Sequence, residues 1–208
     1  MIGIRRRSIL LEAMMSFAAV LSAADIAFSE EIQLKFDPAG RFKIVQFTDL
    51  HLHEGGDKDQ QTLALIGEIL DIEKPQLVVL TGDTLAGAAK RQETVALAAG
   101  PMAERKIPWA VTLGNHDDEW PKDIEKPKDR RGLMEMFVRQ PYSVSKVGPQ
   151  EIFGASNYYL PVYNAGGTQK KWILYMLDSN AYTGKKELGN YDWIHTDQIA
   201  WYSQTSKT

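Results

Sequence analysis

Three short apolar segments each end in a small polar cluster, and this repeated pattern constrains the fold more than any other feature of the sequence. In chain order the pairs are FKIVQFT with DLH, LVVL with TGD, and WAVTL with GNHD, at residues 42–51, 77–83 and 109–117. Near-continuous apolar runs of this length are typical of strands that are covered on both faces. The pattern therefore predicts a sheet with three polar clusters at the ends of its strands.

Helical patterns lie between these segments. Residues 62–72 place apolar side chains at a helical period, and Pro75 follows them. Residues 93–105 predict a second helix, in which Gly100-Pro101 indicates a break or a kink. A repeat of strand, polar tip and helix predicts an α/β layered domain, in which ligands bind beyond the carboxyl ends of the strands.

The later part of the chain predicts further elements of the same domain. Residues 157–162 and 172–177 are apolar segments separated by a turn at 166–168, which indicates a hairpin. Residues 132–139 predict a short helix, and residues 191–204 predict a loop that enters a helix. With 208 residues, of which 44% are hydrophobic, the chain is large enough for one domain with a substantial core.

The composition limits the chemistry available to the protein. The sequence contains no cysteine, so a bound metal has to be held by oxygen and imidazole nitrogen. The formal net charge is -3, and beyond the N-terminus no basic cluster favours nucleic acid or an anionic membrane as a partner. This acidic balance is compatible with a phosphate substrate, because bound cations reverse the local field.

The N-terminus has the features of an export signal. Three arginines precede a mostly apolar stretch at residues 8–24, which ends in small residues. These features predict a signal peptide at 1–24, a folded domain at 25–208 and a secreted or periplasmic location. Glu12 leaves an uncleaved amphipathic helix or anchor as the alternative, and two adjacent arginines weakly fit a twin-arginine export pattern. No other apolar run is long enough to span a bilayer.

The three polar clusters supply a set of metal ligands. In the first cluster, alternation along an extended chain puts Asp49 and His51 on the same side, so that both can bind one ion. In the second, Gly82 lets the backbone turn and approach a ligand closely before Asp83, whose two oxygens can bridge two ions. The third cluster adds the amide oxygen of Asn115. Carboxylates, imidazoles and an amide oxygen suit first-row divalent or trivalent metals.

These motifs resemble a known family of enzymes. DLH, TGD and GNHD, in this order and each at a strand end, are similar to the first three motifs of the calcineurin-like metallophosphoesterases. The longer stretches FKIVQFTDLH, IPWAVTLGNHDDE and YDWI with QIAWY resemble the branch related to purple acid phosphatases of bacteria, fungi and plants, over roughly residues 40–204. The resemblance implies a β-sandwich flanked by helices, and the hydrolysis of phosphate esters by a water that two metal ions activate.

The resemblance also implies a role for each metal-binding residue. Asp49 and His51 would bind the first metal, and Asp83 would bridge both metals. Asn115 would bind the second metal and contact the substrate phosphate. The two ions would be iron, manganese or zinc, and the sequence does not choose among them.

Two further residues enter the chemistry that the resemblance implies. His116 would not bind metal but would lie over the leaving group, as a general acid or as a clamp on the substrate phosphate. Asp117 would orient His116. The substrate would be a phosphate monoester or diester, and its identity and the oligomeric state stay open.

Two departures from the family pattern bear on activity. Purple acid phosphatases place a tyrosine ligand three residues after the bridging aspartate, where this chain has Ala86. The family also completes its site with a later histidine and a Gly-His-x-His motif, whereas only His195 of the four histidines follows His116 here, in a segment that does not match. We therefore expect the remaining ligands, and the C-terminal part of the sandwich, to lie beyond Thr208.

Two other functions stay open at the level of sequence. A truncated, non-catalytic fragment would fold poorly or bind one metal weakly, and an exported binding protein would hold phosphate or a metal without turnover. Outside the ligand set, His53 is expected at the surface or at a pocket rim, His195 is expected to be structural, and Asp178 is expected to cap a strand.

Overall fold

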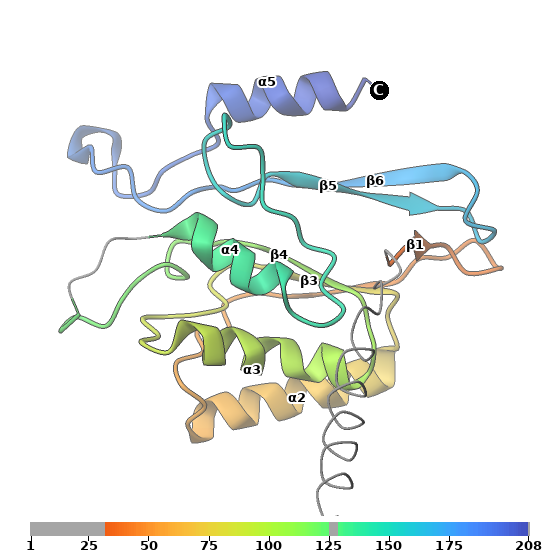
Figure 1. Ribbon diagram of the computed structural model, residues 1–208, viewed down its shortest axis with the longest axis horizontal. Coiled ribbons are helices and arrows are strands. Elements are labelled where there is room, and N and C mark those ends of the chain that lie inside the picture. Colours follow the sequence, from red (N-terminus) through yellow and green to blue (C-terminus); the bar gives the residue numbers. More distant parts are fainter. Residues whose placement is uncertain (1–31, 125–128, 208) are drawn as a thin grey trace, which may run out of the picture. The chain divides into compact units, whose positions relative to one another are not determined.

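Two three-stranded sheets form the centre of the fold (Figure 1). The computed structural model describes residues 32–124 and 129–207, so the signal peptide predicted at 1–24 lies outside the described residues. One sheet has the order β2-β3-β4, with strands at Ile44–Phe47, Leu77–Thr81 and Trp109–Thr112. The other has the order β1-β5-β6, with strands at Leu34–Lys35, Tyr158–Tyr163 and Lys170–Met176.

The sheet of β2, β3 and β4 is entirely parallel, and this topology positions the polar clusters. β3 pairs with β2 on one side and with β4 on the other, in a register that places Phe47 opposite Leu80 and Thr81 opposite Thr112. The carboxyl ends of all three strands therefore meet at one edge of the sheet. The three strands that the apolar segments predicted are confirmed.

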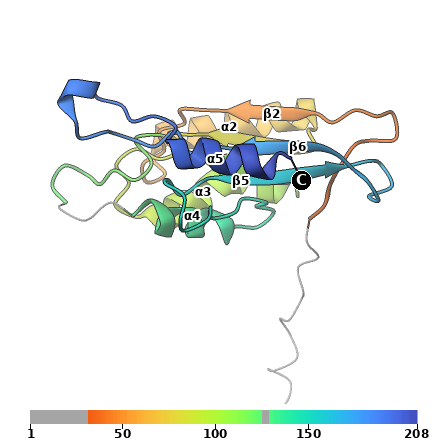
Figure 2. The same ribbon diagram turned by 90° about the horizontal axis from the view of Figure 1, so that it is seen from above.

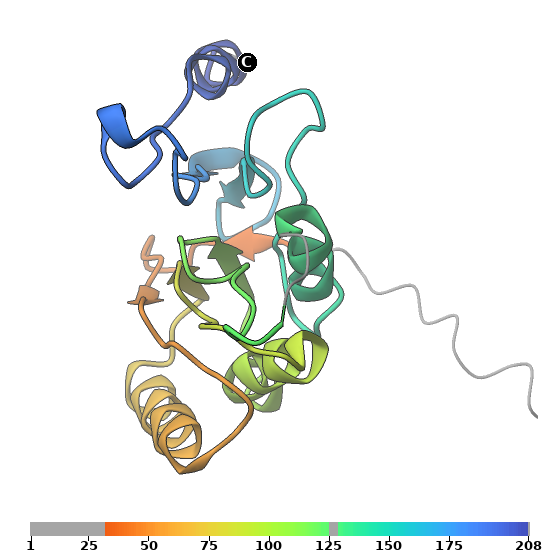
Figure 3. The same ribbon diagram turned by 90° about the vertical axis from the view of Figure 1, so that its left-hand side faces the viewer.

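Helices α2 (Asp57–Glu73) and α3 (Arg91–Glu104) cover one face of this sheet, as the end-on view in Figure 3 shows. They bury apolar side chains such as Leu70 and Val95, each of which stabilises the fold by roughly 1.5–3 kcal/mol. α3 is not interrupted at Pro101, where the sequence predicted a break or a kink. Pro101 lies in the last turn, so its missing N–H removes a hydrogen bond only near the helix end.

The second sheet packs its buried face against the other side of the parallel sheet. Tyr158, Leu160 and Val162 are buried along β5 and alternate with more exposed residues, as expected for a strand with one covered face. They belong to the same apolar cluster as Val78 and Val111, so the core lies between the two sheets. This mixed α/β sandwich with flanking helices confirms the predicted fold class.

Two further helices complete the described chain. α5 (Thr196–Thr205) lies over the β5–β6 hairpin (Figure 2), where Trp201 and Tyr202 meet Tyr175 edge-on with ring centroids 6.0 and 4.8 Å apart. α4 (Arg130–Val138) flanks the sheets. The predicted hairpin and both of these helices are confirmed. Within the residues that the structure describes, no helix is both long enough and apolar enough to cross a membrane.

Two hydroxyl groups in and just before β5 form hydrogen bonds with backbone groups in and just after β4. The Tyr158 hydroxyl donates to the carbonyl of Val111 at 2.7 Å and accepts from its N–H at 3.2 Å. The hydroxyl of Ser156 accepts from the N–H of Leu113 at 3.1 Å. Burial raises the pKa of Tyr158 well above its usual value. These bonds tie the second sheet to the strand that carries the GNHD cluster.

Candidate metal centre

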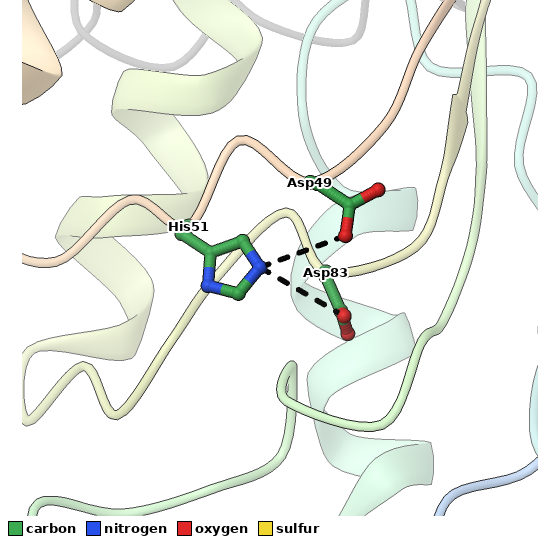
Figure 4. Close-up of side chains that lie close together, drawn as sticks. All are labelled: Asp49, His51 and Asp83. Carbon is green, nitrogen blue, oxygen red and sulfur yellow. Dashed lines mark ion pairs between the residues drawn. The ribbon is translucent and has the colours of Figure 1, made fainter.

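Asp49, His51 and Asp83 bring their ligand atoms together at the edge of the parallel sheet (Figure 4). Nε2 of His51 lies 3.7 Å from an oxygen of Asp49 and 3.9 Å from an oxygen of Asp83, and the three ligand atoms lie within 4.8 Å of one another. A cation bonded to nitrogen or oxygen at roughly 2.0–2.2 Å holds two ligand atoms no more than about 4.4 Å apart. Both histidine–carboxylate separations meet this condition, and the three side chains form a group that could hold one metal ion.

All three of these residues have a left-handed backbone conformation. The φ angles are 57° at Asp49, 49° at His51 and 50° at Asp83. The tip is therefore not extended, although the predicted convergence of Asp49 and His51 holds. A non-glycine residue in this region persists only where its surroundings fix it. Here the Asp49 N–H donates to the Gly82 carbonyl at 3.1 Å, and the His51 N–H donates to the Asp83 carbonyl at 2.9 Å.

Two glycines allow the tips of β3 and β4 to touch. Gly82 has a φ of 105°, and a Cβ on it would lie 2.8 Å from the Cα of Gly114. Gly82 makes its close approach to the neighbouring tip, whereas the sequence predicted a close approach to a ligand, which stays a prediction. As a result, Asp83 lies directly beside the tip that carries Asn115.

The two oxygens of Asp83 face different tips. One lies 3.9 Å from Nε2 of His51, and the other accepts a hydrogen bond from the backbone N–H of His116 at 2.8 Å. The Asp83 side chain is only 13% exposed, whereas that of Asp49 is 62% exposed, so Asp83 is the inner member of the group. The carboxylate of Asp83 therefore contacts both neighbouring tips.

Asp117 holds the tips together. Its buried carboxylate accepts hydrogen bonds from the backbone N–H groups of Asp83, Leu85 and Gly114, at 2.7 to 2.9 Å. Burial raises the pKa of this carboxyl to about 6, against the lowering effect of the hydrogen bonds from Leu85 and Gly114. The sequence predicted that Asp117 orients His116. The structure corrects this, because the carboxylate is turned inward to three backbone donors that need an acceptor.

Glu119 is the residue that holds the ring of His116. Nδ1 of His116 lies 2.8 Å from a carboxylate oxygen of Glu119, and the ring centroid of His116 is 5.2 Å from that of His51. The hydrogen bond to Glu119 raises the pKa of His116, while burial acts in the opposite direction. Sequence reasoning missed Glu119, although an acidic residue three positions after His116 in the same turn was a usable signal.

Tyr182 contacts the same tip from the other half of the fold. The side-chain N–H of Asn115 donates to the Tyr182 hydroxyl at 2.7 Å, and this hydroxyl donates to Glu119 at 3.1 Å. Partial burial raises the pKa of Tyr182. Since Asn115 donates through its nitrogen, its amide oxygen is the atom left for a cation. Tyr182 is 67 residues from Asn115 in sequence, and no spacing rule would have found it.

Asp178 fixes the segment that follows β6. It is buried, pairs with Arg130 at 2.7 Å, and accepts the N–H groups of Ala155 and Asn180 at 2.8 and 2.9 Å. Arg130 also donates to the carbonyl of Gly114 at 2.9 Å. The predicted structural role of Asp178 is confirmed. It extends beyond capping a strand, because Arg130 links this segment to the tip of β4.

The other polar residues singled out in the sequence lie outside the group of three ligands. His195 begins α5, lies 2.9 Å from Asp192 and stacks on Phe153 at 3.9 Å between centroids, so it is structural as predicted. His53 is exposed. Ala86 is half-buried and offers no side-chain ligand at the position of the tyrosine in purple acid phosphatases.

The donors in this centre indicate a class of protein. The candidate metal ligands are the carboxylates of Asp49 and Asp83 and the imidazole of His51, with the amide of Asn115 beside them. This set suits manganese, iron or zinc. His116, held by Glu119, lies next to it. The parallel strands place this set at the carboxyl edge of the sheet, where α/β proteins bind ligands. The molecule therefore has the fold and the donor set of a metal-dependent α/β protein.

The chain belongs to the calcineurin-like phosphoesterase family, whose model matches residues 42–205. This confirms the resemblance carried by the three motifs. Membership of the family supports the hydrolysis of phosphate esters in general, and the family's two-metal centre agrees with the ligand group at the sheet edge.

Several named proteins are similar to the chain. Phosphatase DCR2 of Saccharomyces cerevisiae is 40% identical over 181 residues, which cover 76% of this chain and 30% of that protein. Probable inactive purple acid phosphatase 29 of Arabidopsis thaliana is 31% identical over 231 residues, 98% of this chain and 58% of that protein. Probable inactive purple acid phosphatase 14 of the same plant is 32% identical over 202 residues, 84% of this chain and 49% of that protein. The chain spans 30% to 58% of the length of these relatives.

Proposed function

We propose that the protein hydrolyses phosphate monoesters or diesters with two metal ions bound at the edge of the β2-β3-β4 sheet. The observation that carries this proposal is the placement of Asp83, with one oxygen toward His51 and the other at the backbone of His116. Placed between the two tips, the carboxylate of Asp83 would contribute to holding both metal ions. Family membership supports the type of reaction.

In this proposal each ion has its own set of side chains. Asp49, His51 and Asp83 bind one ion, and Asp83 and Asn115 contribute to the other. The ions are iron, manganese or zinc, which polarise a phosphoryl oxygen and lower the pKa of a bound water. The side chains of Asp49 and His51 are 62% and 42% exposed, so ions and a phosphate group can reach them from solvent.

His116 acts on the leaving group. Because Nδ1 is hydrogen-bonded to Glu119, the ring has Nε2 available for the substrate. In the metal-free protein the hydrogen bond to Glu119 raises the pKa of His116. Nε2 can then clamp a phosphate oxygen or donate its proton to the departing oxygen. Asn115 adds a contact to the phosphate through its amide.

Enzyme assays combined with metal analysis test this function. Asp83→Asn should abolish hydrolysis of p-nitrophenyl phosphate and bis(p-nitrophenyl) phosphate and should lower the metal content, since a neutral amide does not bridge two cations. Asp123→Asn, the same change at an exposed loop residue, should leave both quantities unchanged. Undiminished turnover by the Asp83 variant would rule out the two-metal reaction.

Binding without turnover is the second candidate function. Two of the relatives are named as probable inactive purple acid phosphatases, and Ala86 replaces a ligand of the active enzymes. Calorimetry would then show metal-dependent binding of inorganic phosphate, with no product formed from either ester. A protein that takes up neither metal nor phosphate would instead behave as a non-catalytic fragment.

We also propose that the protein is exported after removal of residues 1–24. The arginines at the start and the apolar stretch after them support this location. Mass spectrometry of the protein from the medium or periplasm tests it. A chain that begins near residue 25 is expected, and an intact chain confined to the cell interior would contradict the proposal.

A further inference from the structure

The Tyr182 hydroxyl lies between two side chains of the β4 tip. The side-chain N–H of Asn115 donates to it at 2.7 Å, and it donates to Oε1 of Glu119 at 3.1 Å. Oε2 of Glu119 is 2.8 Å from Nδ1 of His116. The four side chains form one continuous series of hydrogen bonds, which joins the proposed metal ligand Asn115 to the proposed acid His116.

We infer that Tyr182 is a positioning residue for phosphoester hydrolysis, which fixes the amide of Asn115 and, through Glu119, the ring of His116. This inference rests on the function proposed above and deepens it. Tyr182 lies in the segment after β6, outside the three motifs, and its hydroxyl contacts Asn115 and Glu119 directly.

The effect on Asn115 follows from the chemistry of an amide. The side chain has one oxygen, which can bind a cation, and one NH2 group, which cannot. With the NH2 group hydrogen-bonded to Tyr182, the oxygen is turned to the other side of the amide. Without the hydroxyl, the amide can rotate and present its NH2 group to the cation, so part of the population loses this ligand.

The effect on His116 passes through Glu119. The Tyr182 hydroxyl occupies one carboxylate oxygen of Glu119, which leaves the other oxygen directed at Nδ1 of His116. A carboxylate at Nδ1 selects the form of the ring that carries a proton there and orients Nε2 toward the site. Tyr182 therefore holds the two phosphate-facing side chains in one arrangement.

The loop that carries Tyr182 is itself fixed. It is closed by a bridge between Tyr182 and Tyr191, whose rings stack at 5.8 Å, and by the N–H of Asp192 donating to the carbonyl of Ala181 at 3.1 Å. The short 3-10 helix η1 (Lys186–Leu188) lies within this closed loop. The Tyr182 hydroxyl therefore lies on a loop whose two ends are held together.

One guanidinium holds the base of this loop against the β4 tip. Arg130 pairs with Asp178 at 2.7 Å and donates to the carbonyl of Gly114 at 2.9 Å. Asp178 in turn accepts the N–H of the buried Asn180, two residues before Tyr182. The separation of Tyr182 from Asn115 is therefore set by packed groups, as positioning at sub-ångström precision requires.

Tyr182→Phe tests the inference because it removes one oxygen and keeps the ring that stacks on Tyr191. Tyr191→Phe is the matched control, since it is the same change in the same bridge at a side chain that is 65% exposed. Nuclear magnetic resonance of the metal-free protein reports the Asn115 amide directly. We expect its two NH2 proton resonances to move or broaden in Tyr182→Phe and to be unchanged in Tyr191→Phe.

Metal titration and kinetics give the functional readouts. In calorimetric titration with Mn²⁺, Tyr182→Phe should weaken the weaker of two sites by about 10-fold and leave the tighter one unchanged, the lower end of the effect of removing an outer hydrogen-bond partner. With p-nitrophenyl phosphate, kcat should fall by a similar factor and KM much less. Tyr191→Phe should match the wild type in both assays.

The outcomes separate this inference from the proposed function. A wild-type protein that takes up two Mn²⁺ ions, with a Tyr182→Phe variant indistinguishable from Tyr191→Phe, would overturn the inference and leave the function standing. If the wild-type protein binds fewer than two ions, the two-metal function fails in this chain, and the Asn115 amide resonances of the metal-free protein decide the inference: resonances that are the same in Tyr182→Phe and Tyr191→Phe would overturn it. Should Tyr182→Phe fail to fold, Glu119→Gln serves instead. It should lower kcat without weakening either metal site, and an unchanged kcat would refute the series of hydrogen bonds.

Discussion

Gly114→Ala tests the close approach of the β3 and β4 tips, on which the candidate centre depends. A Cβ on Gly114 would lie 2.6 Å from the backbone nitrogen of Asp83 and would also overlap a carboxylate oxygen of that residue. Contacts of this kind are ordinary only from 3.4 Å upward. The two tips must therefore separate by several tenths of an ångström, and Asp83, the inner ligand, has to move.

The magnitude follows from the bonds that this movement strains. Overpacking of this kind costs about 1–3 kcal/mol. Asp117 also holds Gly114 and Asp83 by backbone hydrogen bonds of 2.7 and 2.9 Å, and losing one hydrogen bond to a charged group costs about 1.5–3 kcal/mol. We expect a total loss of roughly 3–5 kcal/mol, a large share of the roughly 5–15 kcal/mol by which such domains are stable.

Urea unfolding and Mn²⁺ titration measure the two consequences. The midpoint of unfolding should fall at an unchanged slope, and the affinity for Mn²⁺ should fall at least about 10-fold. Gly100→Ala is the matched control, because a Cβ at this position in α3 meets nothing within 4 Å. It should raise stability by about 0.5–1 kcal/mol. A Gly114 variant that behaved like the Gly100 variant in both measurements would refute the reasoning.

Three further predictions concern the sheets and the ligands. Tyr158→Phe removes a hydroxyl bonded to both backbone groups of Val111 and should cost about 1–3 kcal/mol at pH 7 by urea unfolding. Burial raises the pKa of Tyr158 in the folded protein, so the unfolded chain releases the hydroxyl proton at a lower pH than the folded protein does. The contribution of the neutral hydroxyl to stability is therefore complete below about pH 10 and is lost above it. The variant should therefore lose less stability than the wild type between pH 9 and 11, and equal slopes would contradict this. Asp178→Asn removes one of the two buried carboxylates that pair with Arg130, since Asp118 remains 3.4 Å from the guanidinium. It should cost about 1.5–3 kcal/mol, and a change below about 1 kcal/mol would contradict the described pairing. Saturation with Mn²⁺ at about 100 times its dissociation constant should stabilise the wild type by about 2.7 kcal/mol, and His51→Ala should abolish most of this gain in a thermal melt.

The sequence was sufficient for the three strands of the α/β domain and for the convergence of the three ligands at one sheet edge. The runs at β3 and β4 are largely apolar on successive residues, which indicates strands covered on both faces, whereas the edge strand β2 includes the exposed Gln46. Once these strands are parallel, their carboxyl ends share one edge whatever the details of the loops. The prediction was robust because it depended on topology alone. The extended tip assumed for Asp49 and His51 was wrong, and the two residues still met.

The role of Asp117 shows where reasoning along the chain fails. Asp117 is next to His116, and adjacency favoured it as the orienting carboxylate. The backbone of the tip decides otherwise, because the N–H groups of Asp83, Leu85 and Gly114 point at one enclosed position and need an acceptor there. Asp117 fills that position, and Glu119 is left to bind the ring.

The ligands and some of the groups that contact them come from different sheets, and this explains why the motifs did not reveal part of the site. The ligands of the parallel sheet follow their strands directly and carry recognisable local patterns. Beside Asp117 and Glu119, further groups contact the tip of β4 from the second sheet and its loops: Tyr182, and Asp178 through Arg130. Their partners are fixed only by tertiary packing, so no spacing encodes them. Left-handed tips such as that of Asp83 are strained on their own. The second sheet therefore adds contacts to the tip of β4, even though none of the three clustered ligands lies in it.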